Sequence, residues 1–217
     1  MFDATTARRL MVDGQIRTAD VTDAALLDAL RTVPREQFLP PALAPLAYLD
    51  ADILLGKGRA LLRPMVLAKL IQAAPISAGA RILDVGCATG YSAAILARLG
   101  AFVVALEEDA DLAAAATAAL AAVGAINAQV VVGPLVAGWR AGAPYDGILL
   151  NGAAEVVPEV LGDQLKPGGW LIGVGGRPPA CKGMVYRVTE GCLVGRPIFD
   201  AAATSLPGFR APPSFVF

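Results

Sequence analysis

The chain has 217 residues, of which 56% are hydrophobic, and its 18 lysines and arginines against 19 acidic residues leave a net charge of −1. This balance excludes the broad basic surface of a general nucleic-acid binder. Histidine is absent, which excludes a Ser-His-Asp triad, a Cys-His pair and any histidine-bearing zinc site, and we expect no metal.

The cysteines are odd in number and lack C-x-x-C spacing, so they indicate reduced thiols and a cytoplasmic protein. They are Cys87, Cys181 and Cys192. The first residues, MFDATTARRLMVDGQ, are charged throughout, and we expect no secretory signal. Residues 112–139 carry no charge and exceed the ~20 residues of a membrane span. The turn VGAIN and a Gly-Pro pair interrupt them, so we predict no transmembrane helix.

Helical patterns dominate the first part of the chain. They cover residues 5–16, 21–34 and 65–74. The second begins at Thr22 or Asp23 as a plausible N-cap and stops at Pro34, and Pro64 occupies the first turn of the third.

Short β-branched runs alternate with helical ones after residue 79. The predicted strands are 81–86, 102–107, 128–133, 147–152 and 170–175, and the helical segments between them are 91–100, 110–124 and 157–169. This alternation predicts parallel strands in a doubly wound sheet with helices on both faces. Residues 184–188 and 192–199 follow without a long helix and predict an antiparallel return at the sheet edge.

These patterns predict an α/β protein with a Rossmann-like, doubly wound sheet of about seven strands, the last antiparallel, behind a helical N-terminal segment. We expect one domain in three parts. They are the N-terminal segment 1–78, the core 79–175, and the antiparallel edge with the tail, 176–217.

A candidate ligand site follows the first core strand, because doubly wound sheets bind ligands at the carboxyl ends of their strands. The stretch LDVGCATG has the pattern G-x-A-x-G, and Ala88 breaks a dinucleotide fingerprint. Glu107 ends the next strand, where a carboxylate can accept both hydroxyls of a ribose. The alternative is a tight strand–helix turn without a ligand. The candidate residues are Asp84, Gly86, Ala88, Gly90 and Glu107.

These motifs carry a resemblance. The chain resembles a class I S-adenosylmethionine-dependent methyltransferase in three successive places: LDVGCATGYSAAILARLG, then Glu107, then YDGILLNGAAEVVPEVLGDQLKPGGWLIGVGG. More narrowly, the order resembles protein-L-isoaspartate O-methyltransferase, and MVDGQIRTADVTDAALLDALRTVPREQFLP is similar to the N-terminal segment of that family. The match runs from about Arg9 to Gly175.

The resemblance implies transfer of a methyl group from S-adenosylmethionine to the α-carboxylate of an isoaspartyl residue in a damaged protein. The resulting ester collapses to a succinimide, which allows repair. A carboxylate is already nucleophilic, so the enzyme need only hold it in line with the sulfonium methyl, and no general base is required. The five candidate residues would then bind the cofactor in an open pocket.

The substrate segment departs from the family pattern, which reads approximately T-I-S-Q-P. Here Ala60 and Leu62 replace the two hydroxyl residues, and Leu62 stands at the position of the catalytic-site serine. Losing a charge-assisted hydrogen bond to a carboxylate costs roughly 1.5–3 kcal/mol. Arg63 is either a replacement partner for that carboxylate or a solvated surface charge.

The cofactor side departs too. The family usually has G-D-G where this chain has Pro134 in the middle position, so the carboxylate for the adenine amine is lost. Ala88 also places a methyl group where the backbone and the cofactor approach most closely. We expect weak affinity for S-adenosylmethionine and weak or lost activity.

Two functions remain open. One is a divergent protein carboxyl methyltransferase acting on a protein substrate. The other is a non-catalytic accessory subunit of a larger assembly. Bacterial members of a similar divergent branch are associated with respiratory NADH dehydrogenase (complex I), which would place a cytoplasmic protein at the periphery of a membrane complex.

Two apolar features bear on the second function. In residues 110–124 the inward stripe is predicted to be Leu112, Ala116, Leu120 and Val123, while Ala114, Ala118 and Ala121 face outward. Alanine there is either a plain helix former or part of a partner patch. The tail LPGFRAPPSFVF, with Phe215 and Phe217, either packs across the domain or docks on another protein.

Overall fold

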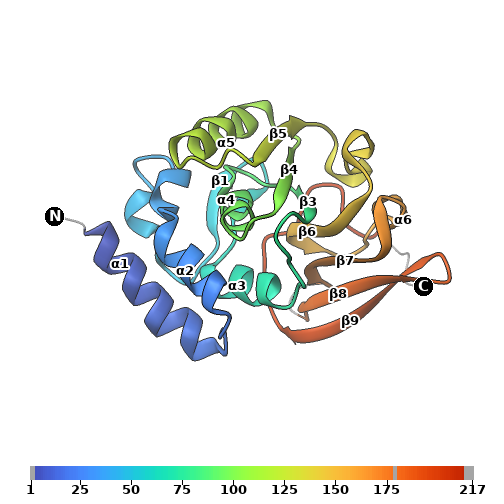
Figure 1. The fold of residues 1–217 in the computed structure, drawn as a ribbon, viewed down its shortest axis with the longest axis horizontal. Coiled ribbons are helices and arrows are strands. Elements are labelled where there is room, and N and C mark those ends of the chain that lie inside the picture. The colour runs from blue at the N-terminus through green and yellow to red at the C-terminus, as the bar shows by residue number, and fades with distance from the viewer. Residues whose placement is uncertain (1–2, 178–179, 213–217) are drawn as a thin grey trace.

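A seven-stranded sheet in the order β5-β4-β3-β6-β7-β8-β9 forms the centre of the protein (Figure 1). The structure is a computed structural model that describes residues 3–177 and 180–212. The first five strands of this sheet along the chain are β3 (Arg81–Val85), β4 (Phe102–Glu107), β5 (Ala128–Val132), β6 (Tyr145–Ala154) and β7 (Leu165–Gly175), and they pair in parallel. All five lie where the buried β-branched runs predict them, which confirms the α/β fold class.

The edge of the sheet is a hairpin without an intervening helix, as the sequence predicts. β8 (Lys182–Thr189) is antiparallel to β7, and β9 (Cys192–Asp200) is antiparallel to β8. β9 therefore runs in the same direction as the core strands. The hairpin lies at the far end of the sheet from β5 (Figure 1).

Five longer helices are described: α1 (Ala4–Met11), α2 (Ala24–Thr32), α3 (Pro64–Gln72), α4 (Tyr91–Arg98) and α5 (Ala110–Ala122). Two of them, α2 and α3, begin where caps were predicted. The Asp23 side chain accepts a hydrogen bond from Leu26 N at 2.8 Å, and Pro64 opens α3. The uncharged run 112–139 is divided between α5, β5 and the turns after each. No helix in the described part of the chain is long and apolar enough to cross a membrane.

The helix predicted over 157–169 is much shorter than expected. Only α6 (Glu159–Gly162) is helical, and β7 already begins at Leu165, which pairs with Tyr145. Pro167 and Gly168, the latter at φ 76°, lie within β7 and are residues that a helix over 157–169 would not accommodate.

The two faces of the sheet are covered unequally. Helices α1 to α5 pack on one face, over side chains that include Ile82, Val103 and Ile172. Over the described ranges, the other face is covered by α6, the 3₁₀ turn Leu135–Ala137 and the segment that carries Leu206 and Phe209. The tail therefore packs across the domain as far as Phe209, whereas Phe215 and Phe217 lie outside the described residues.

A separate two-stranded hairpin precedes α3. β1 (Ile53–Gly56) pairs antiparallel with β2 (Arg59–Leu61), and Gly56 and Gly58 adopt positive φ angles of 87° and 71° in the turn. The sequence analysis did not predict this hairpin. It carries Arg59 to the carboxyl ends of the core strands.

Candidate functional site

The five candidate residues gather at the carboxyl ends of β3 and β4, and we call them the strand-end site: Asp84, Gly86, Ala88, Gly90 and Glu107. The loop after β3 is anchored because Gly86 N and Cys87 N donate to Leu106 O at 2.8 and 3.1 Å. Ala88 holds a φ of 51°, a left-handed conformation that disfavours a side chain, in the tight turn before α4.

The Glu107 carboxylate is fully buried and is held by three backbone N–H groups. Ala88 N donates to Oε2 at 2.7 Å, and Glu108 N and Asp109 N donate to Oε1 at 2.9 and 3.3 Å. Such donors fix the direction of the carboxylate.

A fourth partner of Glu107 is the Arg59 side chain. Arg59 Nε lies 3.2 Å from both carboxylate oxygens, and Nη2 lies 3.1 Å from Oε2. Arg59 Nη2 also donates to Gly86 O. Arg59 is 3% exposed and Glu107 0%. The two buried charges therefore neutralise each other inside the strand-end site.

Leu206 closes the space beside Arg59. A Cβ on Gly86 would lie 2.5 Å from Arg59 Nη2 and 2.9 Å from Leu206 Cδ2, and a Cβ on Gly152 would lie 2.7 Å from Leu206 Cγ. Leu206 N donates to Ala153 O at 2.8 Å, which holds the leucine over the ends of β3 and β6. The space beside Gly86 and Gly152 is therefore filled by side chains of the protein itself.

Asp84 belongs to a buried network that the sequence analysis missed in part. Its Oδ2 accepts from Ser92 Oγ at 2.6 Å and its Oδ1 from Asn151 Nδ2 at 3.4 Å, and Asn151 also donates to Ser92. Burial raises the pKa of Asp84 to about 7, assisted by the charge of Glu107 and opposed by Ser92, Arg59 and Asn151. The signal for Asn151 was its place near the carboxyl end of a predicted strand.

The substrate segment lies in the core. Ala60 and Leu61 are buried, and Leu62 is 1% exposed and packs in the larger hydrophobic cluster. Arg63 lies outside the strand-end site: its Nε is 3.7 Å from Asp52 Oδ1, and its backbone N donates to the same oxygen at 3.0 Å. The structure thus gives Arg63 an ion-pair partner within the chain.

The prediction of an open pocket bounded by Asp84, Gly86, Gly90 and Glu107 was wrong. All four residues are buried, and Arg59 and Leu206 fill the space over Gly86. If Glu107 accepts the ribose of S-adenosylmethionine, as the sequence predicts, that nucleoside would need the carboxylate that Arg59 holds. In this arrangement the residues do not fit the cofactor. The sequence could not indicate this, because Arg59 and Glu107 meet only through the fold.

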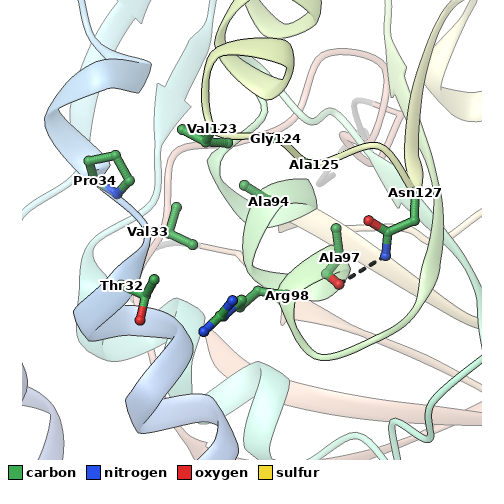
Figure 2. A pocket seen from close by; sticks show the side chains of 10 residues that line it. All are labelled: Thr32, Val33, Pro34, Ala94, Ala97, Arg98, Val123, Gly124, Ala125 and Asn127. Atoms are coloured by element: carbon green, nitrogen blue, oxygen red, sulfur yellow. Dashed lines mark hydrogen bonds between the residues drawn. The ribbon is translucent and has the colours of Figure 1, made fainter.

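A cavity of about 270 Å³ lies elsewhere (Figure 2). It opens between the end of α2, the last turn of α4 and the turn after α5, and its lining includes Thr32, Arg98 and Asn127. Asn127 Nδ2 donates to Ala97 O at 2.9 Å. The cavity is at the opposite end of α4 from Gly90 and contains none of the candidate residues. Within the described ranges, no group of three or more acidic or cysteine side chains is placed to hold a metal ion.

Comparisons with known proteins agree with the motifs. The family model for Protein-L-isoaspartate(D-aspartate) O-methyltransferase (PCMT) matches residues 7–178. The chain is 44% identical over 170 residues to a protein-L-isoaspartate O-methyltransferase of Methylorubrum extorquens (strain PA1), covering 78% of this chain and 74% of that protein. It is 41% identical over 171 residues to that of Methanoregula boonei, covering 78% and 79% of the two chains.

Solved structures share the fold. One protein-L-isoaspartate O-methyltransferase superposes with a TM-score of 0.79 at 23% identity, over 93% of this chain and 66% of that one. A candidate protein-L-isoaspartate O-methyltransferase from Plasmodium falciparum, solved in complex with S-adenosyl-L-homocysteine, gives a TM-score of 0.75 at 18% identity, over 95% and 99% of the two chains.

Proposed function

Because the chain belongs to the protein-L-isoaspartate O-methyltransferase family, we propose that it retains the family fold but transfers methyl groups to isoaspartyl carboxylates weakly or not at all. The family reaction uses S-adenosylmethionine as the methyl donor and a damaged protein as the acceptor. The proposal concerns the residues that would hold these two reactants.

The observation that carries the proposal is the burial of the substrate segment. Leu62 stands at the position of the family serine, is 1% exposed and packs among core side chains. No hydroxyl at position 60 or 62 is available to a reacting carboxylate. A missing charge-assisted hydrogen bond costs roughly 1.5–3 kcal/mol, or about one to two decades in binding or rate.

A second substitution acts on the cofactor. Pro134 precedes the 3₁₀ turn Leu135–Ala137 and offers no side-chain acceptor for an adenine amine. The two substitutions lie in separate elements, so their costs should add, and together they would slow the reaction by about two to four decades.

The test is transfer of labelled methyl from S-adenosylmethionine to an isoaspartyl peptide. The Methylorubrum extorquens protein, 44% identical, is the matched positive control. We expect this chain to turn over at least about 100-fold more slowly than that control. Turnover comparable to the control would refute the proposal.

The second candidate function is a non-catalytic subunit of a larger assembly. The observation that favours it is the outer face of α5, where Ala114, Ala118 and Ala121 are exposed and Asp111, in the first turn, supplies a charge. The proposed location is the cytoplasm, at the periphery of a membrane complex, and respiratory NADH dehydrogenase is the assembly to test. We expect the native protein to co-sediment with NADH dehydrogenase activity. Sedimentation as a free chain would exclude this function.

A further inference from the structure

We propose that the β1–β2 hairpin is an internal strap whose Arg59 side chain occupies the nucleoside position on Glu107, so that a nucleoside ligand binds only after Arg59 leaves that carboxylate. The inference deepens the proposed function and rests on its assignment of Glu107 to the ribose. It concerns how the strand-end site is closed, whereas the proposed function concerns whether methyl is transferred.

Arg59 resembles the expected ligand in its hydrogen bonding. A ribose offers two neighbouring hydroxyl donors to a carboxylate, and a guanidinium offers a planar fork of N–H donors to the same group. Arg59 Nε and Nη2 lie 3.1–3.2 Å from the Glu107 oxygens. Three backbone N–H groups take further acceptor positions on these oxygens. A carboxylate has about four lone-pair sites, so no acceptor remains for a ribose while Arg59 is present.

The strap has a second attachment. Lys57, in the turn of the hairpin, places Nζ 2.6 Å from Asp109 Oδ2 and 2.9 Å from Asp111 Oδ2. These carboxylates stand at the beginning of α5, directly after Glu107 in the chain. The hairpin therefore crosses the end of β4 with one cation, Lys57, in its turn and another, Arg59, at the start of β2.

The C-terminal segment completes the cover. Asp52, next to β1, accepts from Thr204 N at 2.8 Å and from Thr204 Oγ1 at 3.1 Å. Two residues later, Leu206 packs over Gly86 beside Arg59. The strap and the segment 204–206 are thus linked and cover the strand-end site together.

Arg59 can leave Glu107 without breaking a hydrogen bond of the main sheet, but moving the whole strap would also expose the buried Ala60 and Leu61. β1 and β2 pair only with each other among the described residues, and a two-stranded hairpin is marginally stable alone. If the closed form makes up about 90–99% of the molecules, the apparent affinity for a nucleoside is weakened about 10- to 100-fold.

Calorimetric titration with S-adenosylhomocysteine tests the strap, because this probe carries no methyl group to transfer. We expect Arg59→Gln to bind it at least about tenfold more tightly than the unsubstituted chain. Arg98→Gln makes the same charge change at an exposed site on α4, paired with Asp28, and should bind like the unsubstituted chain. Equal affinity of the unsubstituted chain and Arg59→Gln, or no binding by a folded Arg59→Gln, would overturn the inference.

Hydrogen exchange on the unsubstituted chain covers the case in which Arg59→Gln does not fold. Saturating S-adenosylhomocysteine should accelerate amide exchange of residues 53–61 severalfold while it protects residues 86–90. Protection of 86–90 with unchanged exchange in the hairpin would show that the ligand and the closed strap coexist, and would overturn the inference.

The outcomes separate this inference from the proposed function. Tighter binding by Arg59→Gln without methyl transfer supports both. Tight binding by the unsubstituted chain without methyl transfer overturns the strap and leaves the proposed function standing. Tighter binding by Arg59→Gln, in a chain whose turnover matches the Methylorubrum extorquens protein, supports the strap and refutes the proposed function.

Discussion

Arg59 and Glu107 form a buried ion pair, in which the side chains are 3% and 0% exposed. In all the remaining ion pairs of the described residues, each side chain is at least 13% exposed. Because water cannot solvate either group of the buried pair, removing one charge would leave the other buried without a counter-charge. The pair also joins the hairpin to the end of β4. It therefore bears on stability as well as on ligand access.

Glu107→Gln should destabilise the protein by about 3–5 kcal/mol, because it leaves the Arg59 guanidinium buried without its counter-charge. Urea unfolding measures the loss. The double variant Arg59→Met with Glu107→Gln removes both charges and should recover most of it. A single variant as stable as the unsubstituted chain would show that Arg59 reaches solvent when its partner is removed.

Asp84 should make the protein less stable as the pH rises. Burial raises the pKa of Asp84 from the ordinary 3.8 to about 7, so between these values the folded chain binds a proton that the unfolded chain has released. Over that window this group reduces stability with increasing pH, by at most about 1.4 kcal/mol per pH unit. Asp84→Asn should remove this slope, measured by urea unfolding between about pH 4 and 8.

Asp146→Asn is the control for that measurement. Against the effect of partial burial, hydrogen bonds from Lys166 and from Arg81 N lower the pKa of Asp146. The stability that ionised Asp146 contributes is therefore present above the ordinary pKa of 3.8 and is lost only as the pH falls below that value. Asp146→Asn should leave the slope between about pH 4 and 7 unchanged. A slope that persists in Asp84→Asn would assign the titration to another group.

The core of the fold could be predicted because its signals are local. Runs of β-branched residues mark β3 to β7. Asp23 marks the start of α2 through its hydrogen bond with Leu26 N, and Pro64 marks the start of α3 through its fixed φ angle. The predicted helix 157–169 was wrong beyond α6, which ends at Gly162, because Leu165 already begins β7 and Pro167 and Gly168 disfavour a helix there.

The closed state of the site could not be predicted from the sequence. Arg59 stands in GKGRALL, where a lone arginine beside lysine and glycine resembles a surface charge, and its burial depends on Glu107, which is 48 residues away. Leu206 meets Gly86 through contacts distant in the chain, since Thr204 pairs with Asp52, 152 residues earlier, and Leu206 N donates to Ala153 O. Motif positions predicted which residues gather at the ends of β3 and β4, and their binding role stays a prediction. The motifs contained no information on which side chains would occupy the strand-end site.

Arg35→Lys should destabilise the protein by about 3–5 kcal/mol although the charge is kept. Arg35 is fully buried, donates from Nε to Ala47 O at 2.7 Å and from Nη2 to Leu62 O at 2.6 Å, and lies 4.7 Å from the centre of the Tyr91 ring. One ammonium group cannot reach both carbonyls and stack on the ring. Thermal or urea unfolding measures the loss. Arg31→Lys, at an exposed pair with Asp13, should change stability by less than about 0.5 kcal/mol.

Restoring the family residues should not restore methyl transfer unless the strap is also released. The double variant Leu62→Ser with Pro134→Asp restores the hydroxyl and the adenine-side carboxylate of the family, but Arg59 and Leu206 still cover Gly86. Leu62→Ser also removes a core side chain at a cost of about 2–5 kcal/mol, so folding must be checked by circular dichroism first. We expect transfer of labelled methyl to an isoaspartyl peptide to rise at least about tenfold only when Arg59→Gln is added to the double variant. Adding Arg98→Gln instead makes the same charge change far from the site and should give no rise. If the double variant alone gains as much activity as the triple variant, the missing hydroxyl and carboxylate limit the reaction and the strap does not.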